Sequence, residues 1–368
     1  MTRENAYVTN TVSGHLQEFI QDALYNYDLP GLSVGIQKGE GAPMVFSAGY
    51  SNYGKKKLLD DNNIFHMASI TKLFTGSSIL KLANEGYLSL GDPLISLMPY
   101  FSMREDKITG GDYKTITLRQ VLSHTAGLPD VTDYHWELEE KDEDALFRYC
   151  TSEDVQSRTL LWSPLENKFS YSNIGYELLG LLVQEVSGLS FDDYVANNFF
   201  GPLNMNRSTL KTYERTPKCS LKFEDLEDVG VVVPYEKDKN NHIVRVPHFP
   251  YHRGHGPSST LTAPLTDVLK WGQAFFQPSS IINDTLGDED PWKAIAPITN
   301  SQEHIGLSWF IREEDGLSFY GHEGSDDGFR SSFWICPKKK LAVLVCSNLS
   351  KAPVKKINKR VYEILLNP

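Results

Sequence analysis

The alternation of apolar and polar positions predicts strands at both ends of the chain and helices between them. Near the N-terminus, an amphipathic helix over 12–27 precedes two strand-like runs, 32–37 and 44–50. The last third holds four more strand-like runs and a closing helix over 354–366, and these runs are 306–311, 317–320, 329–336 and 341–347. Helical periodicity dominates the middle, where the clearest helices are expected over 72–85, 174–186, 191–200 and 262–276.

The most economical arrangement of these elements joins the terminal strands in one antiparallel sheet and covers it with the terminal helices. We therefore predict an α/β (α+β) fold with a mostly helical second subdomain beside the sheet. The expected α/β part is about 1–65 and 300–368, and the mostly helical part is about 66–299. A catalytic cleft is then expected between the two parts.

Composition narrows the class of protein. Hydrophobic residues make up 40% and charged residues 23% of the chain, which is typical of a soluble globular protein. The net charge of −11 argues against a nucleic acid or an anionic membrane as partner. No apolar leader and no run of 18 apolar residues is present, so we expect no signal peptide and no membrane span. These signs favour a cytoplasmic protein, with a processed secreted form as the alternative.

The four cysteines, Cys150, Cys219, Cys336 and Cys346, form no CxxC pair, so a zinc or thioredoxin-like site is not expected. If the last two apolar runs form a hairpin, Cys346 lies opposite residues near Ser331 rather than opposite Cys336. Free buried thiols are the expectation, and they fit a reducing compartment.

One stretch combines a hydroxyl and an amine on an apolar helix. Ser69 and Lys72 are three residues apart and therefore lie on one helix face, and the residues that follow are apolar on nearly all sides. A desolvated lysine loses its proton more readily and can then activate a neighbouring serine. The alternative is a plain helix N-terminus with a capping Ser and a Lys whose ammonium reaches solvent.

Two further segments carry polar groups at the edges of predicted elements. Tyr171-Ser172-Asn173 directly precedes the helix over 174–186, and Gly321-His322-Glu323-Gly324-Ser325 lies on a strand. Ser-x-x-Lys, Tyr-x-Asn and His-x-Gly in this order resemble the serine β-lactamase and penicillin-binding-protein superfamily. The tyrosine is similar to the class C branch, which also holds esterases and D-peptidases. The resemblance covers nearly the whole chain and implies a single β-lactamase-like catalytic domain over 1–368.

The resemblance implies a role for each matching residue. Ser69 would be the acylated nucleophile, Lys72 would hold or accept its proton, and Tyr171, with a lowered phenol pKa, would share the base role. Asn173 would hydrogen-bond Lys72 or the substrate, the N–H groups of Ser69 and Ser325 would form the oxyanion hole, and Gly324 would let substrate approach. The alternative for Tyr171 is an ordinary buried tyrosine before an Asn-capped helix.

His322 stands where β-lactamases carry Lys. Histidine is mostly neutral at pH 7, which disfavours efficient β-lactamase activity. We expect His322 at the edge of the site and a fall in activity below its pKa, which is about 6.5 when unperturbed. The alternative is a packing histidine at the end of a strand.

Three other patterns do not enter the predicted site. Tyr50-Ser51-Asn52 precedes the nucleophile, and His252-Arg253-Gly254 lies in a Pro- and Gly-rich loop, so order and context reject both. His248, His252 and His255 have a spacing that would suit zinc on a helix, but Pro and Gly between them make a helix implausible. We therefore expect no metal and no cofactor, and a loop that shapes the substrate pocket.

The expected activity is that of a metal-independent serine hydrolase acting through an acyl-enzyme on small esters or amides, similar to a carboxylesterase or a D-peptidase. Two alternatives stay open at this point. One is an acyltransferase of the same family, and the other is a penicillin-binding sensor that is acylated without turnover.

Overall fold

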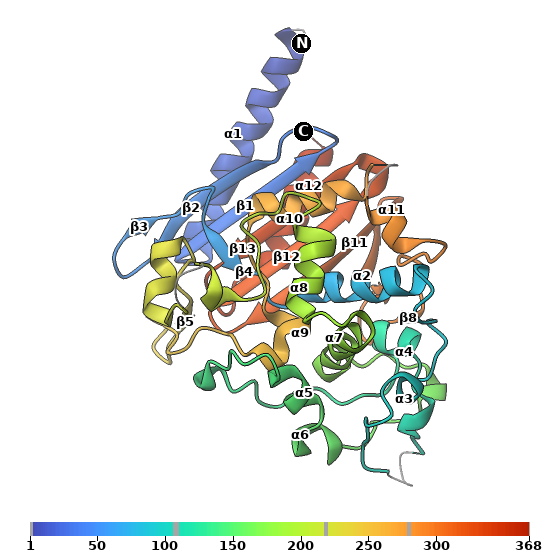
Figure 1. Cartoon of the computed structure of the whole chain (residues 1–368). Helices are drawn as coiled ribbons and strands as arrows, with labels where there is room; N and C mark the ends of the chain where they lie inside the picture. The colour runs from blue at the N-terminus through green and yellow to red at the C-terminus, as the bar shows by residue number, and fades with distance from the viewer. Residues whose placement is uncertain (1–2, 106–109, 217–219, 278–280, 368) are drawn as a thin grey trace.

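The centre of the fold is an antiparallel sheet whose strands come from both ends of the chain (Figure 1). The computed structural model describes residues 3–105, 110–216, 220–277 and 281–367. The strand order is β3-β2-β1-β13-β12-β11-β10-β9-β8, so the first strands lie beside the last one. The strands are β1 (Gly31–Lys38), β2 (Met44–Asn52), β3 (Lys57–Leu58), β8 (Ala296–Pro297), β9 (His304–Ile305), β10 (Phe310–Glu314), β11 (Leu317–Asp326), β12 (Phe329–Cys336) and β13 (Leu341–Ser347). The predicted α/β fold is confirmed.

The apolar strand β13 lies inside the sheet, and helices cover the sheet on both faces. Its residues are buried on both faces, as expected for a strand that is apolar throughout. Val343 and Val345 belong to the core beneath the terminal helices α1 (Arg3–Asn26) and α12 (Val354–Leu366). Leu344 and Cys346 face the opposite core, where α10 (Leu265–Ala274) covers the sheet. The helix predicted over 262–276 therefore packs against the sheet.

The strand predicted over 306–311 begins later than expected. Residues 306–309 form a turn in which the Gly306 N–H donates to Trp309 O, and Ser308 has a φ of +72°. The Ser308 N–H donates to Leu122 O instead of to a neighbouring strand. A left-handed residue interrupts the extended backbone, so β10 starts only at Phe310.

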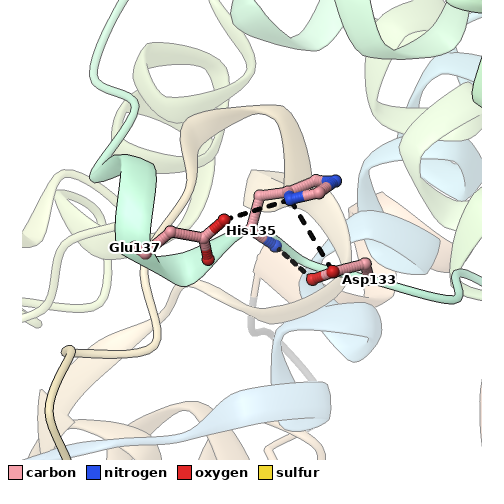
Figure 2. A group of neighbouring side chains, drawn as sticks. All are labelled: Asp133, His135 and Glu137. Atoms are coloured by element: carbon pink, nitrogen blue, oxygen red, sulfur yellow. Dashed lines mark hydrogen bonds and ion pairs between the residues drawn. The ribbon is translucent and has the colours of Figure 1, made fainter.

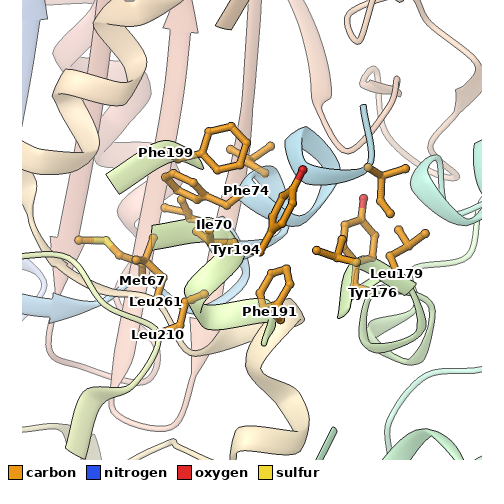
Figure 3. Packing of buried hydrophobic residues seen from close by; sticks show 14 of the residues in the cluster. Met67, Ile70, Phe74, Tyr176, Leu179, Phe191, Tyr194, Phe199, Leu210 and Leu261 are labelled. Carbon is orange, nitrogen blue, oxygen red and sulfur yellow. The ribbon is translucent and has the colours of Figure 1, made fainter. Parts of the chain in front are cut away.

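The rest of the chain forms a mostly helical layer around α2 (Thr71–Asn84). Helix α2 is buried on all sides from Thr71 to Leu80, as its apolar sequence predicted. Figure 3 shows Phe74 of this helix among buried side chains that include Phe199 and Ile70. The other helices are α3 (Leu94–Leu97), α4 (Leu118–Leu122), α5 (Ala145–Cys150), α6 (Glu153–Gln156), α7 (Asn173–Ser187), α8 (Phe191–Val195), α9 (Gly256–Ser259) and α11 (Ile281–Leu286).

Two further two-stranded antiparallel sheets lie outside the main sheet. Strand β4 (Ile64–His66) pairs with β7 (Thr262–Pro264), and β5 (Tyr235–Lys237) pairs with β6 (Ile243–Arg245). Directly after β4, the Met67 N–H donates to Leu261 O at 2.8 Å. The first pair therefore fixes the start of α2 against a segment almost 200 residues later.

The cysteines within the described part of the chain follow the prediction. Cys150, Cys336 and Cys346 are free and buried, and Cys346 pairs with Ser331 in the register of β12 and β13. Cys219 lies outside the described residues. Among the described helices, none is both long enough and apolar enough to cross a membrane.

Candidate active site

The turn that carries Ser69 is held in an unusual backbone conformation. Ala68 has a φ of +48°, a left-handed value that is costly for a residue with a Cβ atom. Two hydrogen bonds hold the turn, because Thr71 Oγ1 donates to Ala68 O at 2.7 Å and Ser331 Oγ donates to Met67 O at 2.7 Å. Ser69 follows with 9% of its surface exposed, so its hydroxyl meets a cavity while its backbone is fixed.

Lys72 is fully buried, and its ammonium makes three hydrogen bonds. Its Nζ donates to Ser69 Oγ at 3.1 Å, to Asn173 Oδ1 at 2.5 Å and to Ser258 O at 2.9 Å. Desolvation lowers the pKa of Lys72 to about 8, although the carboxylates of Glu177 and Asp130 act against it. The expected pairing of a desolvated lysine with the Ser69 hydroxyl is therefore present.

Tyr171 reaches the same hydroxyl from the segment that precedes α7. Its phenol hydrogen-bonds Ser69, and its ring stacks on His124 with centroids 4.5 Å apart. Lys72 Nζ lies 5.0 Å from the Tyr171 ring centroid. Burial nevertheless raises the pKa of Tyr171 well above its usual value, and the hydrogen bond to Ser69 acts only partly against this. The expectation of a lowered phenol pKa is therefore wrong, because desolvation of the phenolate outweighs the favourable contacts.

The first turn of α7 positions Asn173. Ser172 caps the helix by accepting from the Gly175 N–H at 3.1 Å, and its own N–H donates to His124 Nδ1 at 3.1 Å. Asn173 donates from its N–H and from Nδ2 to Asp130 Oδ1, at 2.7 and 2.9 Å. These bonds orient the amide so that its Oδ1 accepts from Lys72.

Strand β11 supplies the other wall of the site. Strand β10 pairs with β11 only as far as Gly321, so within the described chain the segment from His322 to Asp326 pairs on one edge alone, with β12. Every second backbone N–H and C=O of this segment therefore points to an open edge. Ser325 lines the cavity beside Ser69.

His322 lines the wall of the cavity that contains Ser69 and is buried there, with 1% of its surface exposed. Its Nδ1 donates to Glu323 O at 2.6 Å, and its ring lies 4.9 Å from that of Phe310. Burial and the nearby charge of Lys72 lower the pKa of His322 to about 3. The expectation of a titration at about 6.5 is therefore wrong, because the buried imidazole stays neutral.

A cavity of about 370 Å³ joins most of the predicted residues. Its lining residues are Ser69, Asp130, Tyr134, Tyr171, Asn173, Glu303, Phe310, His322, Glu323, Ser325, Trp334 and Lys355. We call it the nucleophile cavity. Lys72 lies behind Ser69, outside the lining. Gly324 is outside it as well, and a Cβ there would lie 2.3 Å from Met67 O and 2.0 Å from Ser331 Oγ. Gly324 thus allows β11 to approach the nucleophile turn closely.

A family model described as Beta-lactamase matches residues 16–366. The chain belongs to the β-lactamase family. Members of this superfamily are serine hydrolases. The contacts among Ser69, Lys72 and Tyr171 therefore lie within the part of the chain that the family model covers.

Two curated proteins are similar to this chain. Protein flp of Staphylococcus aureus is 27% identical over 98% of this chain and 68% of its own length. Penicillin-binding protein 4* of Bacillus subtilis is 24% identical over 86% of this chain and 67% of its own length.

Two solved structures share the fold. One is the octameric penicillin-binding protein homologue from Pyrococcus abyssi, with a TM-score of 0.79 and 24% identity over 96% of this chain and 77% of that one. The other is a D-amino acid amidase from Ochrobactrum anthropi, with a TM-score of 0.78 and 18% identity over 97% of this chain and 99% of that one.

The structure adds residues that the sequence analysis missed. Glu177, one helical turn after Asn173, is buried below Lys72, where its Oε1 accepts from Ser258 Oγ at 2.5 Å and contacts His255 Nδ1 at 3.1 Å. Burial raises the pKa of Glu177 to about 8. Its place on an otherwise apolar helix was a visible signal, because a carboxylate on a buried face needs a partner.

The histidine loop does not gather its three imidazoles. The ring centroids of His252 and His255 lie 5.1 Å apart, but His255 Nδ1 contacts the Glu177 carboxylate. His248 belongs to no group of potential metal ligands among the described residues. In the described part of the chain, only Asp133, His135 and Glu137 bring potential ligand atoms together, within 4.8 Å (Figure 2). These three side chains are exposed or half-buried and form ion pairs on the surface.

Proposed function

We propose that this chain is a serine hydrolase that acts through an acyl-enzyme on Ser69 and cleaves small esters or amides without a metal. The observation that supports this most is the pair of contacts at one hydroxyl: Lys72 Nζ lies 3.1 Å from Ser69 Oγ, and the Tyr171 phenol hydrogen-bonds the same serine. A nucleophile that touches both an amine of lowered pKa and a neutral phenol has a base and an acid within reach.

In the proposed reaction, the neutral Lys72 amine takes the proton of Ser69 as Oγ bonds to the substrate carbonyl carbon. The N–H groups of Ser69 and Ser325 donate to the carbonyl oxygen as it becomes negative, and by analogy with other hydrolases each donor contributes roughly 2.7–4 kcal/mol. Tyr171, whose raised pKa keeps the phenol protonated, donates a proton to the leaving oxygen or nitrogen while the bond to it breaks. The Lys72 ammonium then gives its proton to the Tyr171 phenolate, which restores both groups, and water releases the acyl group by the reverse sequence.

The neutral His322 makes an efficient β-lactamase the less favoured activity, because the cavity wall offers an imidazole where a fixed cation would attract a lactam carboxylate. A solved structure of similar fold is a D-amino acid amidase complexed with D-phenylalanine. Amides and esters of amino acids are therefore the first substrates to test.

The test is labelling followed by turnover. Intact-mass spectrometry after a fluorophosphonate should give one adduct, located on Ser69 by peptide mapping and absent in Ser69→Ala. Unlabelled protein should hydrolyse p-nitrophenyl esters over many cycles. An adduct of equal stoichiometry in Ser69→Ala contradicts the nucleophile, and a single stoichiometric burst on every ester identifies a sensor instead of a hydrolase.

A further inference from the structure

The charged side chains of the nucleophile cavity are mostly acidic. Among its described lining residues, Asp130, Glu303 and Glu323 carry carboxylates and Lys355 carries the one ammonium. Lys355 is already paired, because its Nζ lies 2.6 Å from Glu303 Oε1 and 2.8 Å from Oε2. Asp130 and Glu323 remain as the carboxylates without an ion pair in the described structure.

No cation of the described residues forms an ion pair with Glu323. An adjoining cavity of about 590 Å³ on the α12 side is lined by Arg312, Arg330, Lys356 and Lys359, among others. Arg330 Nη1 donates to the carbonyl oxygens of Asp326 and Phe329. Arg312 Nε and Lys359 Nζ contact Glu314, at 3.4 and 2.8 Å. Their charges are therefore directed towards another carboxylate.

Asp130 and Glu323 are each anchored through one oxygen. Glu323 Oε1 accepts from Trp334 Nε1 at 2.7 Å and from Ser332 Oγ at 3.1 Å. Asp130 Oδ1 accepts from the N–H and Nδ2 of Asn173. The second oxygen of each carboxylate accepts no hydrogen bond from the described residues. A carboxylate held in this way is oriented in advance and keeps one oxygen for a ligand.

Glu323 is the better placed of the two for a substrate. Asp130 belongs to the group that orients Asn173, and it already interacts with the charge of Lys72. Glu323 lies on the opposite wall, on the half of β11 with an open edge and two residues before Ser325. A group bound to Glu323 therefore lies close to a carbonyl held at Ser69 and Ser325.

We propose that Glu323 selects substrates with an ammonium group near the scissile ester or amide bond, as in amino-acid amides and esters with a free amine. This inference rests on the proposed hydrolase activity. An ammonium donates charge-assisted hydrogen bonds to the open carboxylate oxygen, whereas a substrate carboxylate at the same place is repelled. This preference makes the proposed function more specific, because it states which charge the substrate carries near the bond that is cleaved.

The preference should depend on pH. Burial raises the pKa of Glu323 to about 7, while Trp334 and Ser332 on β12 and Lys355 on α12 act against it, and Glu303 adds to it. The carboxylate therefore ionises on passing about pH 7, and a free α-amine loses its proton at about pH 7.7–8.0. Selection of the ammonium should be strongest between these values and weaker at pH 6.

The experiment compares three p-nitroanilides of alanine, in both enantiomers, whose amine is free, acetylated or succinylated. Each is measured at pH 7.5 as a substrate and as a competitor of p-nitrophenyl acetate, so slow turnover still gives an affinity. The free amine should be favoured over the acetyl form by roughly 10- to 100-fold in kcat/KM or in inhibition constant, and the succinyl form should be poorest.

The matched variants are Glu323→Gln and Glu314→Gln. The first keeps an acceptor for Trp334 and should abolish the preference, read as the ratio of free to acetylated substrate in the same variant. The second should retain that ratio. Equal treatment of free and acetyl forms, or a preference that survives Glu323→Gln, overturns this inference alone. Absence of Ser69-dependent hydrolysis of p-nitrophenyl acetate overturns the proposed function and this inference with it.

Discussion

At the scale of single residues, the proposed chemistry depends on two groups whose charge states are set by burial. Lys72 loses its water shell and gains three acceptors, of which only the Ser69 hydroxyl can itself react. Tyr171 shares that hydroxyl, and its raised pKa keeps the phenol neutral. A proton that leaves Ser69 therefore goes to Lys72, and the phenol acts as the acid.

Because Lys72 and Tyr171 act on the same Ser69 hydroxyl and exchange a proton in each catalytic cycle, their losses should not multiply. Lys72→Ala and Tyr171→Phe should each reduce kcat by roughly 10²- to 10⁴-fold, and the double variant should be little worse than the weaker single variant. Steady-state kinetics on one ester in all four proteins measures this. Two losses that multiply in full would mean that the residues act independently.

The acid limb of the pH profile should belong to Lys72. Below its pKa, lowered to about 8, Lys72 is protonated and cannot accept from Ser69, so kcat/KM for a neutral ester should rise with pH through about 8. His322 is neutral above about pH 3 and contributes no limb in this range. The profile is measured in the parent and in His322→Gln, and a limb near 6.5 that disappears in the variant would restore the titrating histidine.

At the scale of elements, the close contact between α7 and α9 positions an acceptor of Lys72. Helix α9 carries Ser258, whose carbonyl oxygen accepts from Lys72 Nζ and whose hydroxyl donates to Glu177 of α7. Gly180, also on α7, makes this approach possible, because a Cβ at that position would lie 2.0 Å from Pro257 Cγ and 2.4 Å from Pro257 Cβ. A rigid proline ring cannot give way to it.

Gly180→Ala should therefore separate the two helices. We expect a loss of about 1–3 kcal/mol in the free energy of unfolding and a fall in kcat, with a smaller effect on KM. Denaturant unfolding and ester kinetics measure the two effects. The control is Gly91→Ala, since the nearest atom to its Cβ would be Ser89 Oγ at 3.8 Å. Unchanged kinetics in Gly180→Ala would mean that the Ser258 contact does not position Lys72.

At the scale of the whole molecule, the nucleophile cavity lies where the sheet meets the helical layer. Ser69, Tyr171 and Asn173 enter it from helical segments, and Ser325 and Trp334 enter it from adjacent strands of the sheet. The groups proposed for catalysis all come from side chains and backbone N–H groups of this junction. None of the proposed steps uses a bound ion.

Catalysis should therefore be independent of metal. Dialysis against EDTA should leave ester hydrolysis unchanged, because no step of the proposed reaction needs a Lewis acid. Activity that is lost on dialysis and restored by zinc would contradict this, and loss of that rescue in Asp133→Asn or in His252→Gln would identify the surface group or the histidine loop.

The sequence by itself determined the features that depend on neighbouring residues. Apolar runs predicted β12 and β13, and helical periodicity predicted the closing helix. Helical spacing likewise placed Lys72 beside Ser69, which the 3.1 Å contact confirms. Each of these follows from dihedral preferences and side-chain periodicity within a few residues.

Only the tertiary structure decided which distant groups meet and which charges survive burial. The Ser258 carbonyl lies 186 residues from Lys72 along the chain, and no local pattern predicts its contact with Lys72. The contact of Asn173, 101 residues from Lys72, was expected only from the family resemblance. The pKa values of Tyr171 and His322 depart from expectation for the same reason, since desolvation depends on what packs around a ring. Local sequence sets the conformation of each element, whereas the packing of elements sets the dielectric environment in which its side chains ionise.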